Sequence, residues 1–392
     1  MANFPSRDPA TARLWLLVAI LFFSYLCVAI SLPIVSVFVT GTLHLDNVWA
    51  GLGVGVAFVS TVLTRAYAGS LTDRSGGKPA VRRGLIYYAL GAAISLAAGA
   101  LAPWPLIAYL VLLAGRLVYG LGESLVAVGV IAWSIGLVGP ARSGMVLALV
   151  GAALYGALAV GGPLGLFLID HVAFAGAMAV SLLLPVFGLL AIWKLTAPAP
   201  QPGPERPPFV RVIGRIWSQG AVVCLQGIGF AAIGAFFALD FLHRHWAGAG
   251  LGLTAFGGGF VLVRVFLGTL PDRIGGLPVA MVSLVVEAIG QALIWGAPDP
   301  AWALAGAFLT GLGCSMVFPS MGREVVRVVE PHLRATALGG FAGFQDLAYG
   351  LTGPLAGLLA DRAGYGSVFL IGAIAAAAGF TLTLYMRPGL KS

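Results

Sequence analysis

Two apolar stretches of the sequence contain ionisable side chains at spacings that a helix would bring onto one face. In the first stretch, Arg116, Tyr119 and Glu123 follow one another at intervals of three and four residues. On an α-helix, Arg116 and Glu123 would lie about 10 Å apart along the axis. In the second stretch, Asp346 stands among apolar and aromatic residues. A carboxyl group in such surroundings can bind and release a proton, and an arginine can pair with a carboxylate or anchor a solute.

Glu123 and Asp346 are therefore the candidate proton-coupling residues. The alternative for Glu123 is a permanent ion pair with Arg116 that only holds the helix in place, and the alternative for Asp346 is a hydrogen-bonded brace between helices. Polar and aromatic residues in these and other apolar stretches could line a cavity for a solute. The candidate cavity residues are Ser24, Tyr25, Arg116, Tyr119, Tyr155, Gln226, Gln345 and Tyr349.

The elements that position these residues must be membrane helices. Of the 392 residues, 59% are hydrophobic and 9% are charged, whereas a soluble domain has about 25% charged residues, so a soluble enzyme is excluded. A membrane-spanning helix needs about 20 residues, and about a dozen apolar stretches are long enough. We expect an all-α membrane protein with twelve transmembrane helices at 14–39, 48–71, 83–102, 105–137, 144–169, 174–194, 215–242, 251–270, 278–297, 301–328, 335–360 and 366–386.

The net charge of +8 reflects how the chain is oriented in the bilayer. Most of the 22 basic residues fall in alternate connections, so the positive-inside rule predicts that both termini are cytoplasmic. No basic helix or aromatic-interleaved patch stands out, and we expect no nucleic-acid partner. The three cysteines are isolated from one another, so no metal site is expected.

A proline-rich connection divides the chain. We expect an N-terminal six-helix half at 1–194, a cytoplasmic linker at 195–214 and a C-terminal six-helix half at 215–392. The halves are related in sequence, because residues 64–80 and 263–279 match at about half of their positions. Parallel repeats of this kind are typical of secondary transporters.

A second stretch also repeats between the halves. Gly162-Pro163 recurs 191 residues later as Gly353-Pro354, and the same offset of 191 residues makes Tyr155 of span 5 equivalent to Asp346 of span 11. The two halves therefore differ in the chemistry that they place at this position.

These motifs resemble those of the major facilitator superfamily over nearly the whole chain. The loop between spans 2 and 3 is similar to the family pattern G-x-L-x-D-R-x-G-R-R, and span 4 is similar to the pattern R-x-x-x-G-x-G. A Gly-Pro motif in span 5 resembles that of the twelve-helix drug:proton antiporters, and residues 318–329 and 343–361 resemble the bacterial YhhS/YfcJ type. The matching residues are Gly69, Leu71, Asp73, Arg74, Gly76, Gly77 and Lys78; Arg116, Gly120 and Gly122; and Gly161, Gly162, Pro163 and Gly165.

The resemblance implies a fold of two pseudo-symmetric six-helix bundles that rock about a central site. It also implies that Asp73 meets the N-terminus of span 11 in the outward-open state. Ninth helices lie outside the cavity in this fold, so we expect Glu287 to make a peripheral structural contact, and we interpret Arg65 and Arg264 as gate or loop-bracing charges. The expected conformational-switch loop comprises Gly69, Asp73, Arg74, Gly76 and Lys78 with the repeat residues Asp272 and Arg273.

From these patterns we expect a secondary active transporter, and not an enzyme, that works by alternating access. The favoured function is proton-coupled export, by antiport, of a small organic or amphipathic solute. The alternatives are a proton-coupled uptake symporter of a small polar metabolite such as a sugar or organic acid, and a receptor that does not transport. We expect no cofactor beyond the coupling proton, a monomer surrounded by lipid, and a multi-pass location in a bacterial inner membrane.

Overall fold

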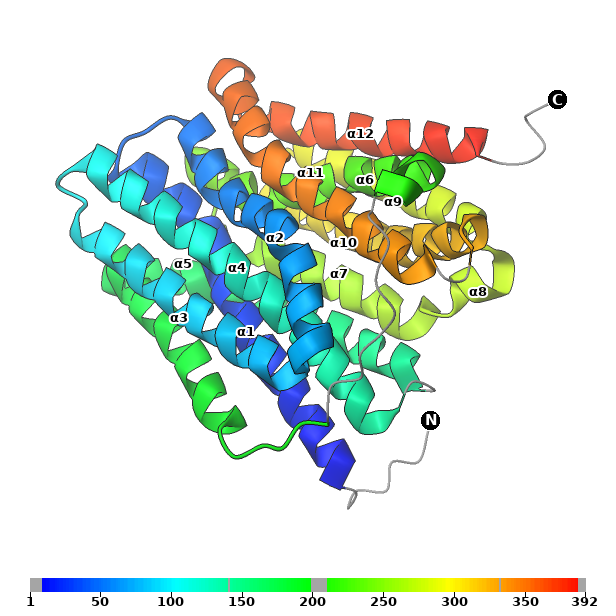
Figure 1. Ribbon diagram of the computed structural model, residues 1–392. Coiled ribbons are helices and arrows are strands. Elements are labelled where there is room, and N and C mark those ends of the chain that lie inside the picture. Colours follow the sequence, from blue (N-terminus) through cyan, green and yellow to red (C-terminus); the bar gives the residue numbers. More distant parts are fainter. Residues whose placement is uncertain (1–8, 140–141, 199–209, 331–332, 387–392) are drawn as a thin grey trace.

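The computed structural model describes residues 9–139, 142–198, 210–330 and 333–386, and within these ranges the chain is helical with no strands. The first half is built from α1 (Pro9–Val37), extended by a π-helical turn η1 (Phe38–Thr42), then α2 (Asn47–Ser75), α3 (Gly77–Ala100), α4 (Pro105–Val138) and α5 (Ser143–Ile192). The second half contains α6 (Val210–His243), α7 (Leu251–Leu267), α8 (Leu270–Ile274), α9 (Gly276–Trp295), α10 (Pro300–Val328), α11 (Arg334–Ala363) and α12 (Gly366–Tyr385). Figure 1 shows these elements as one bundle.

The described helices provide the twelve predicted crossings. Nine of them are long and apolar enough to span a bilayer, while α7 and α11 have membrane-scale lengths. The helix α5 supplies two crossings, because Val172 and Ala173 leave helical geometry and the chain doubles back there. The spans predicted at 144–169 and 174–194 are thus parts of one element with a two-residue corner. The predicted linker at 195–214 overlaps α6, which begins at Val210, and residues 199–209 of that linker lie outside the described residues.

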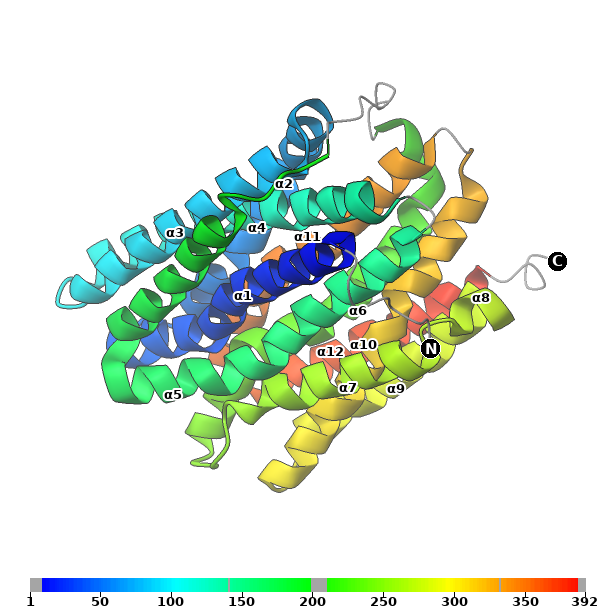
Figure 2. The same cartoon turned by 90° about the horizontal axis from the view of Figure 1, so that it is seen from below.

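Each half has its own helix packing. In the first half, α3 packs on α4 and α1 packs on α5, and in the second half α9 packs on α10 and α6 packs on α11. The halves meet mainly through three pairs, α2 with α11, α5 with α7, and α1 with α6, and α2 also touches α6. The first two pairs are related by the internal repeat, so the same packing joins the halves on both sides of the central α1–α6 contact (Figure 2).

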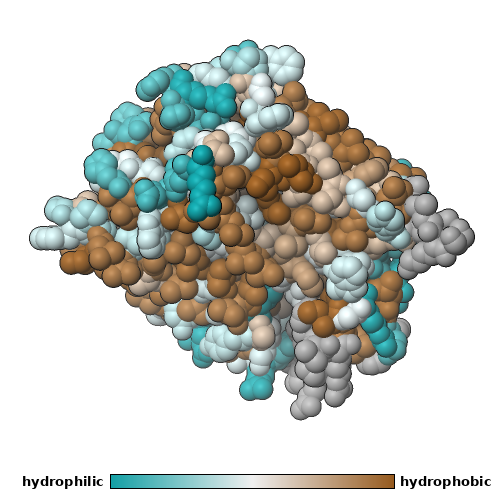
Figure 3. All heavy atoms as spheres, turned by 90° about the horizontal axis from the view of Figure 1, so that it is seen from above, coloured by the Kyte–Doolittle hydropathy of each residue, from teal (hydrophilic) through white to brown (hydrophobic). Residues whose placement is uncertain are grey.

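The outer surface of the bundle suits a lipid environment. Leu63, Phe187 and Leu355 are among many large apolar side chains that are exposed. On the face in Figure 3, hydrophobic residues occupy the broad central area and hydrophilic residues gather mostly toward its edges. Exposed apolar surface on this scale is stable only against acyl chains or another apolar partner.

Two glycine turns show the repeat at the level of backbone conformation. Gly76 ends α2 with φ of 85°, and Gly275 ends α8 with φ of 99°. Residues with a Cβ rarely adopt this left-handed region, so glycine is required at both turns. The same end of the bundle carries the basic residues of the motif loops, and we call it the cytoplasmic end; the opposite end is called the outer end.

Candidate functional site

The two halves are joined at the outer end by a group of hydrogen bonds that we call the outer latch, formed by Asn47, Val48, Asp361 and Tyr365. The Asp361 carboxylate accepts hydrogen bonds from the backbone N–H groups of Asn47 at 3.1 Å and Val48 at 3.2 Å. It also accepts one from the Asn47 side chain at 2.8 Å, and the Tyr365 hydroxyl donates to Asn47 Oδ1 at 2.9 Å. Asp361 therefore caps the first turn of α2 from the other half.

Below the latch, α2 and α11 approach each other through glycines. A Cβ atom on Gly51 would collide with the backbone of Gly353, and one on Gly55 would collide with the backbone of Gly350. Such contact brings two helix backbones closer than any side chain would allow. The α2–α11 seam is therefore closed from its outer end toward the middle of the bundle.

The repeat-related seam between α5 and α7 is closed in the same way. Gly162 of the Gly-Pro motif lies against Gly250 and Leu253, and the Thr254 hydroxyl donates to the Ala159 carbonyl at 2.6 Å. Gly257 packs against the backbone of α5 near Tyr155. The structure thus has both seams sealed in their outer halves.

Arg65 and Asp346 form an ion pair at the inner limit of the α2–α11 seam. Among the described residues it is the only ion pair that joins the two halves. The Asp346 side chain is 11% exposed, whereas that of Arg65 is 31% exposed although it lies about ten residues, or about 15 Å, from the end of α2. The pair is thus mostly buried at Asp346 and partly exposed at Arg65.

Glu123 of α4 lies against α2, the helix that carries Arg65. Its carboxyl is 3.5 Å from the hydroxyl of Thr61, which is one helical turn before Arg65 on α2. Thr61 also donates to backbone carbonyls of α2 and α4, so its hydroxyl is already engaged. The structure therefore brings Glu123 and Asp346 to neighbouring positions along α2: Glu123 is next to Thr61, and Asp346 pairs with Arg65 one turn further on.

The repeat-related position has different chemistry. Arg264 on α7 is equivalent to Arg65, and Tyr155 on α5 is equivalent to Asp346. The guanidinium of Arg264 lies 5.3 Å from the ring centre of Phe260, and that ring stacks on Tyr155. One seam therefore carries an arginine and a carboxylate, while its counterpart carries an arginine and an aromatic stack.

Arg116 braces the first half from within. It is 1% exposed and donates to the Ser31 hydroxyl at 2.7 Å and to the carbonyls of Gly53 at 3.1 Å and Val54 at 3.3 Å. These partners lie on α1 and α2, so one guanidinium fastens α4 to both helices. No ion pair forms between Arg116 and Glu123 within the described part of the chain.

Two further predicted cavity residues are also placed inside the first half. The Tyr119 ring is 1% exposed and makes an edge contact with Tyr88 of α3. The Ser24 hydroxyl donates to the Ile20 carbonyl of its own helix at 2.5 Å. Both side chains pack between helices of one half, and neither reaches the α2–α11 seam.

The remaining predicted cavity residues lie closer to the interface. Gln345 donates to the Tyr349 hydroxyl at 2.6 Å, and the Tyr349 ring contacts Phe58 of α2 and Phe230 of α6. Tyr25 is buried on α1. Gln226 is buried on α6, and its side-chain carbonyl has no hydrogen-bond partner.

The motif loop between α2 and α3 contacts the chain that follows α5. The ammonium group of Lys78 donates to the Trp193 carbonyl at 3.2 Å and to the Leu195 carbonyl at 2.6 Å. Gly69 and Gly76 are buried, Asp73 is half-buried, and Arg74 is exposed. Asp272 and Arg273 are exposed on α8. The predicted Asp73 contact with the start of α11 adjoins residues 331–332, which lie outside the described residues, and it stays a prediction.

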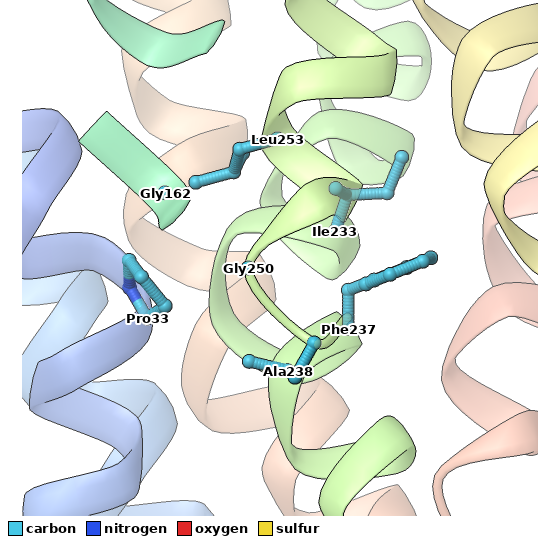
Figure 4. Close-up of a pocket in the computed structure, with 8 residues that line it drawn as sticks. Pro33, Gly162, Ile233, Phe237, Ala238, Gly250 and Leu253 are labelled. Atoms are coloured by element: carbon cyan, nitrogen blue, oxygen red, sulfur yellow. The ribbon is translucent and has the colours of Figure 1, made fainter. Parts of the chain in front are cut away.

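A small cavity lies between the halves near the outer end, bounded by α1, α5, α6 and α7 (Figure 4). It has a volume of about 10 Å³, space for a single water molecule, and it is lined by apolar residues such as Pro33, Ile233 and Phe237. A cavity of this size is a packing defect in the closed seam and too small for an organic solute.

The pairing of Arg65 with Asp346 was not predicted from the sequence, although Arg65 was assigned to a gate. The partners are separated by 281 residues, so only the packing of the halves brings them together. The outer latch was not predicted from the sequence either. In the structure Asp46, the residue before α2, makes no side-chain capping hydrogen bond, so the start of α2 is left open to a partner from the other half.

Comparison with known proteins matches the chain to the family model of the Major Facilitator Superfamily over residues 17–246 and 219–391. An uncharacterized MFS-type transporter of Salmonella typhimurium is 43% identical over 374 residues, which cover 95% of this chain and 96% of the relative. One from Burkholderia pseudomallei is 38% identical over 393 residues, covering 98% and 96%.

Two solved structures are similar in fold. The nucleoside transporter NupG aligns with a TM-score of 0.75 at 17% identity over 95% of this chain and 99% of its own. The human organic anion transporter MFSD10 aligns with a TM-score of 0.70 at 17% identity over 96% and 100%. At this identity the similarity concerns the fold.

Proposed function

Because the chain belongs to the Major Facilitator Superfamily, we propose that it exports a small organic or amphipathic solute in exchange for protons, with Asp346 and Glu123 as the proton-binding groups. Membership makes the chain a multi-pass secondary transporter and not an enzyme. The proposal concerns the coupling ion, the direction and the class of solute.

The observation that carries the proposal is the Arg65–Asp346 ion pair at the inner end of the sealed seam. A carboxylate attracts a guanidinium more strongly than a protonated carboxyl does, so a proton on Asp346 weakens a contact that joins the halves while the outer seam is closed. Protonation therefore favours the state in which the outer side opens. Glu123, beside Thr61 on the same side of α2, would share the proton or the charge.

The same pair gives a physical basis for exchange. A solute that binds Arg65 or Asp346 competes with the partner residue, and a proton on Asp346 competes with that solute. Ligands that exclude each other at one site, and that each release the same contact between the halves, are carried in opposite directions. The Gly-Pro motif resembles that of drug:proton antiporters and lies in the α5–α7 seam, which supports this direction.

The test is proton flux in proteoliposomes of defined orientation under an imposed pH gradient. The solute panel contains amphipathic organic compounds, sugars, organic acids and nucleosides, and the proteins are wild type, Glu123→Gln and Asp346→Asn. Asp170→Asn is the matched control, since Asp170 is exposed at the outer end of α5. We expect solute and proton to move in opposite directions, with coupling lost in at least one of the two test variants and kept in the control.

Movement of solute and proton in the same direction would replace antiport by symport, the alternative in which the protein takes up a polar metabolite. Solute movement without protons in all four proteins would contradict proton coupling and return both carboxyl groups to structural roles.

A further inference from the structure

A second set of buried polar side chains lies inside the second half, apart from the Arg65–Asp346 pair. Glu287, in the middle of α9, is fully buried. Its carboxyl faces α6, where a Cβ atom on Gly229 would meet Glu287 Oε1 at 2.7 Å. Its main chain packs on α10 at Gly313, where an added Cβ would lie 2.7 Å from the Glu287 Cβ. Two glycines thus leave room for a carboxyl group among three helices.

The surroundings of this carboxyl contain more acceptors than donors. Neither Glu287 oxygen has a hydrogen-bond partner, and the side-chain carbonyls of Gln226 on α6 and Gln291 on α9 also have none. The Gln291 amide is already used, since it donates to the Gly229 carbonyl at 3.2 Å and the Thr310 hydroxyl at 3.3 Å. Buried acceptors without donors are rare in folded proteins and require an explanation.

No described cation faces Glu287. On α10 its titratable neighbour is the Cys314 thiol, a weak donor, and Glu287 is the only ionisable residue of α9. On α12 the contact to this region is Gly372, which lies against Gln291. Besides Cys314 and the Cys224 thiol of α6, the ionisable residues of α6, α8, α10 and α12 whose side chains the structure describes lie at the ends of the bundle: Arg215, Asp240, His243, Asp272, Arg273, Arg323, Glu324, Arg327 and Tyr385.

A charged carboxylate in this place would be buried with no counter-ion and with only the weak thiol donor of Cys314 beside it, which is strongly unfavourable. One bound proton removes the charge and supplies the missing donor, directed at one of the unpaired carbonyls. We infer that Glu287 is a proton-binding site in the second half, occupied in the conformation with a closed outer side. This inference does not depend on proton-coupled transport, because it concerns a different carboxyl group from Glu123 and Asp346.

The position of the site links its occupancy to α6. Gly229 lies on α6 and covers the carboxyl, and α6 also meets α1 at the centre of the interface between the halves. If α6 moved away from α9, the Glu287 carboxyl would no longer be covered by Gly229. It would then be open on the side where Gln226 lies and could release its proton. The peripheral structural contact expected for Glu287 is thereby replaced by a buried acid next to a helix at the interface.

The test uses infrared spectroscopy of the purified full-length protein in lipid nanodiscs, in sodium-free buffer at neutral pH. We expect wild type to show a carboxylic-acid C=O band that is lost in Glu287→Gln. The matched control is Glu324→Gln, because Glu324 is also buried but forms an ion pair with Arg327 at 2.9 Å. The control variant should keep the band.

Thermal unfolding provides an independent measurement. Glu287→Gln and the apolar Glu287→Met should melt within about 2 °C of wild type near pH 4, where Glu287 is neutral in both the folded and the unfolded chain and each variant replaces a neutral side chain of similar size. A folded protein that holds a proton released on unfolding loses stability as pH rises above the pKa of an unfolded glutamate, about 4.3, so wild type should lose stability relative to both variants from acidic to neutral pH.

A band that is unchanged in Glu287→Gln, or a wild-type stability that follows the variants at all pH values, would overturn the inference. Sodium would be the bound ion instead if sodium chloride, compared with choline chloride, stabilised wild type but not Glu287→Gln, and that outcome would also overturn it.

Discussion

Arg65 of α2 and Asp346 of α11 form an ion pair across the two halves of the molecule, at the inner end of a seam whose outer part is closed by glycine contacts. The pair makes the closed outer seam sensitive to charge, because glycine packing alone is indifferent to pH and to ionic solutes. The repeat-related seam has Arg264 and Tyr155 in these positions, so at this position only the α2–α11 seam carries a carboxyl group.

Removing one partner of this pair should favour opening of the outer side. In Arg65→Gln, Asp346 keeps its charge but loses its partner, which costs about 1–3 kcal/mol for a buried group and less here because Arg65 is partly exposed. We expect the outer-open population to rise by about tenfold, measured as the labelling rate of a cysteine placed on the outer part of α2. The double variant Arg65→Asp with Asp346→Arg should restore the wild-type rate. If Arg65→Gln does not raise the labelling rate and the double variant does not restore it, the pair does not set this equilibrium.

The outer latch provides a second prediction with an internal control. Asp361→Ala removes the cap that the second half places on α2, whereas Asp299→Ala removes a cap that α10 forms within its own half through Ala301 and Trp302. Each loss should lower the free energy of unfolding by about 1 kcal/mol. Only Asp361→Ala should raise outer accessibility as well, and equal accessibility in the two variants would contradict a gating role for the latch.

The glycine seam can be tested by adding a single methyl group. Gly51→Ala places a Cβ against the backbone of Gly353 and should prevent full closure of the outer side, with transport reduced by about tenfold or more. Gly343→Ala is the control on α11, since an added Cβ there meets nothing within 4 Å. Solute uptake into proteoliposomes checks both variants, and an active Gly51→Ala protein would mean that the close approach is dispensable.

Arg116 should behave as a structural brace. Arg116→Lys keeps the charge but cannot reproduce the three-way donation to Ser31, Gly53 and Val54, so we expect a loss of about 2 kcal/mol in the free energy of unfolding. The solute preference of the remaining active protein should be unchanged. A stable variant with an altered solute profile would instead place Arg116 in the binding site, as the sequence first suggested.

Local sequence patterns were sufficient for the architecture but not for the pairings across it. Composition and the internal repeat predicted an all-helical bundle with twelve crossings, and the family comparison and the fold confirm it. The sequence prediction ended one span at residue 169 and began the next at residue 174, whereas the structure limits the break in α5 to Val172 and Ala173. Helical periodicity placed Arg116, Tyr119 and Glu123 on one face but could not show which neighbours that face meets.

The interface was the least predictable part for a physical reason. Contacts such as Arg65 with Asp346 and Asn47 with Asp361 connect residues about 300 positions apart, and they depend on how the two halves pack against each other. Their residue types are ordinary for helix ends and membrane interiors. Thr61 and Arg65 are one turn apart on α2, and only the structure shows that this face of α2 meets Glu123.

The most direct test of the account is a distance measurement across the outer end as a function of pH. Spin labels at Thr42→Cys and Ala363→Cys occupy exposed positions on the two halves, with Cys224 replaced by serine. Electron–electron double resonance in nanodiscs should show that acidification shifts wild type from a short to a long distance, and that Asp346→Asn gives the long distance at every pH. Distances that do not change with pH in wild type, or that still respond to pH in Asp346→Asn as they do in wild type, would contradict the claim that protonation of Asp346 opens the outer side.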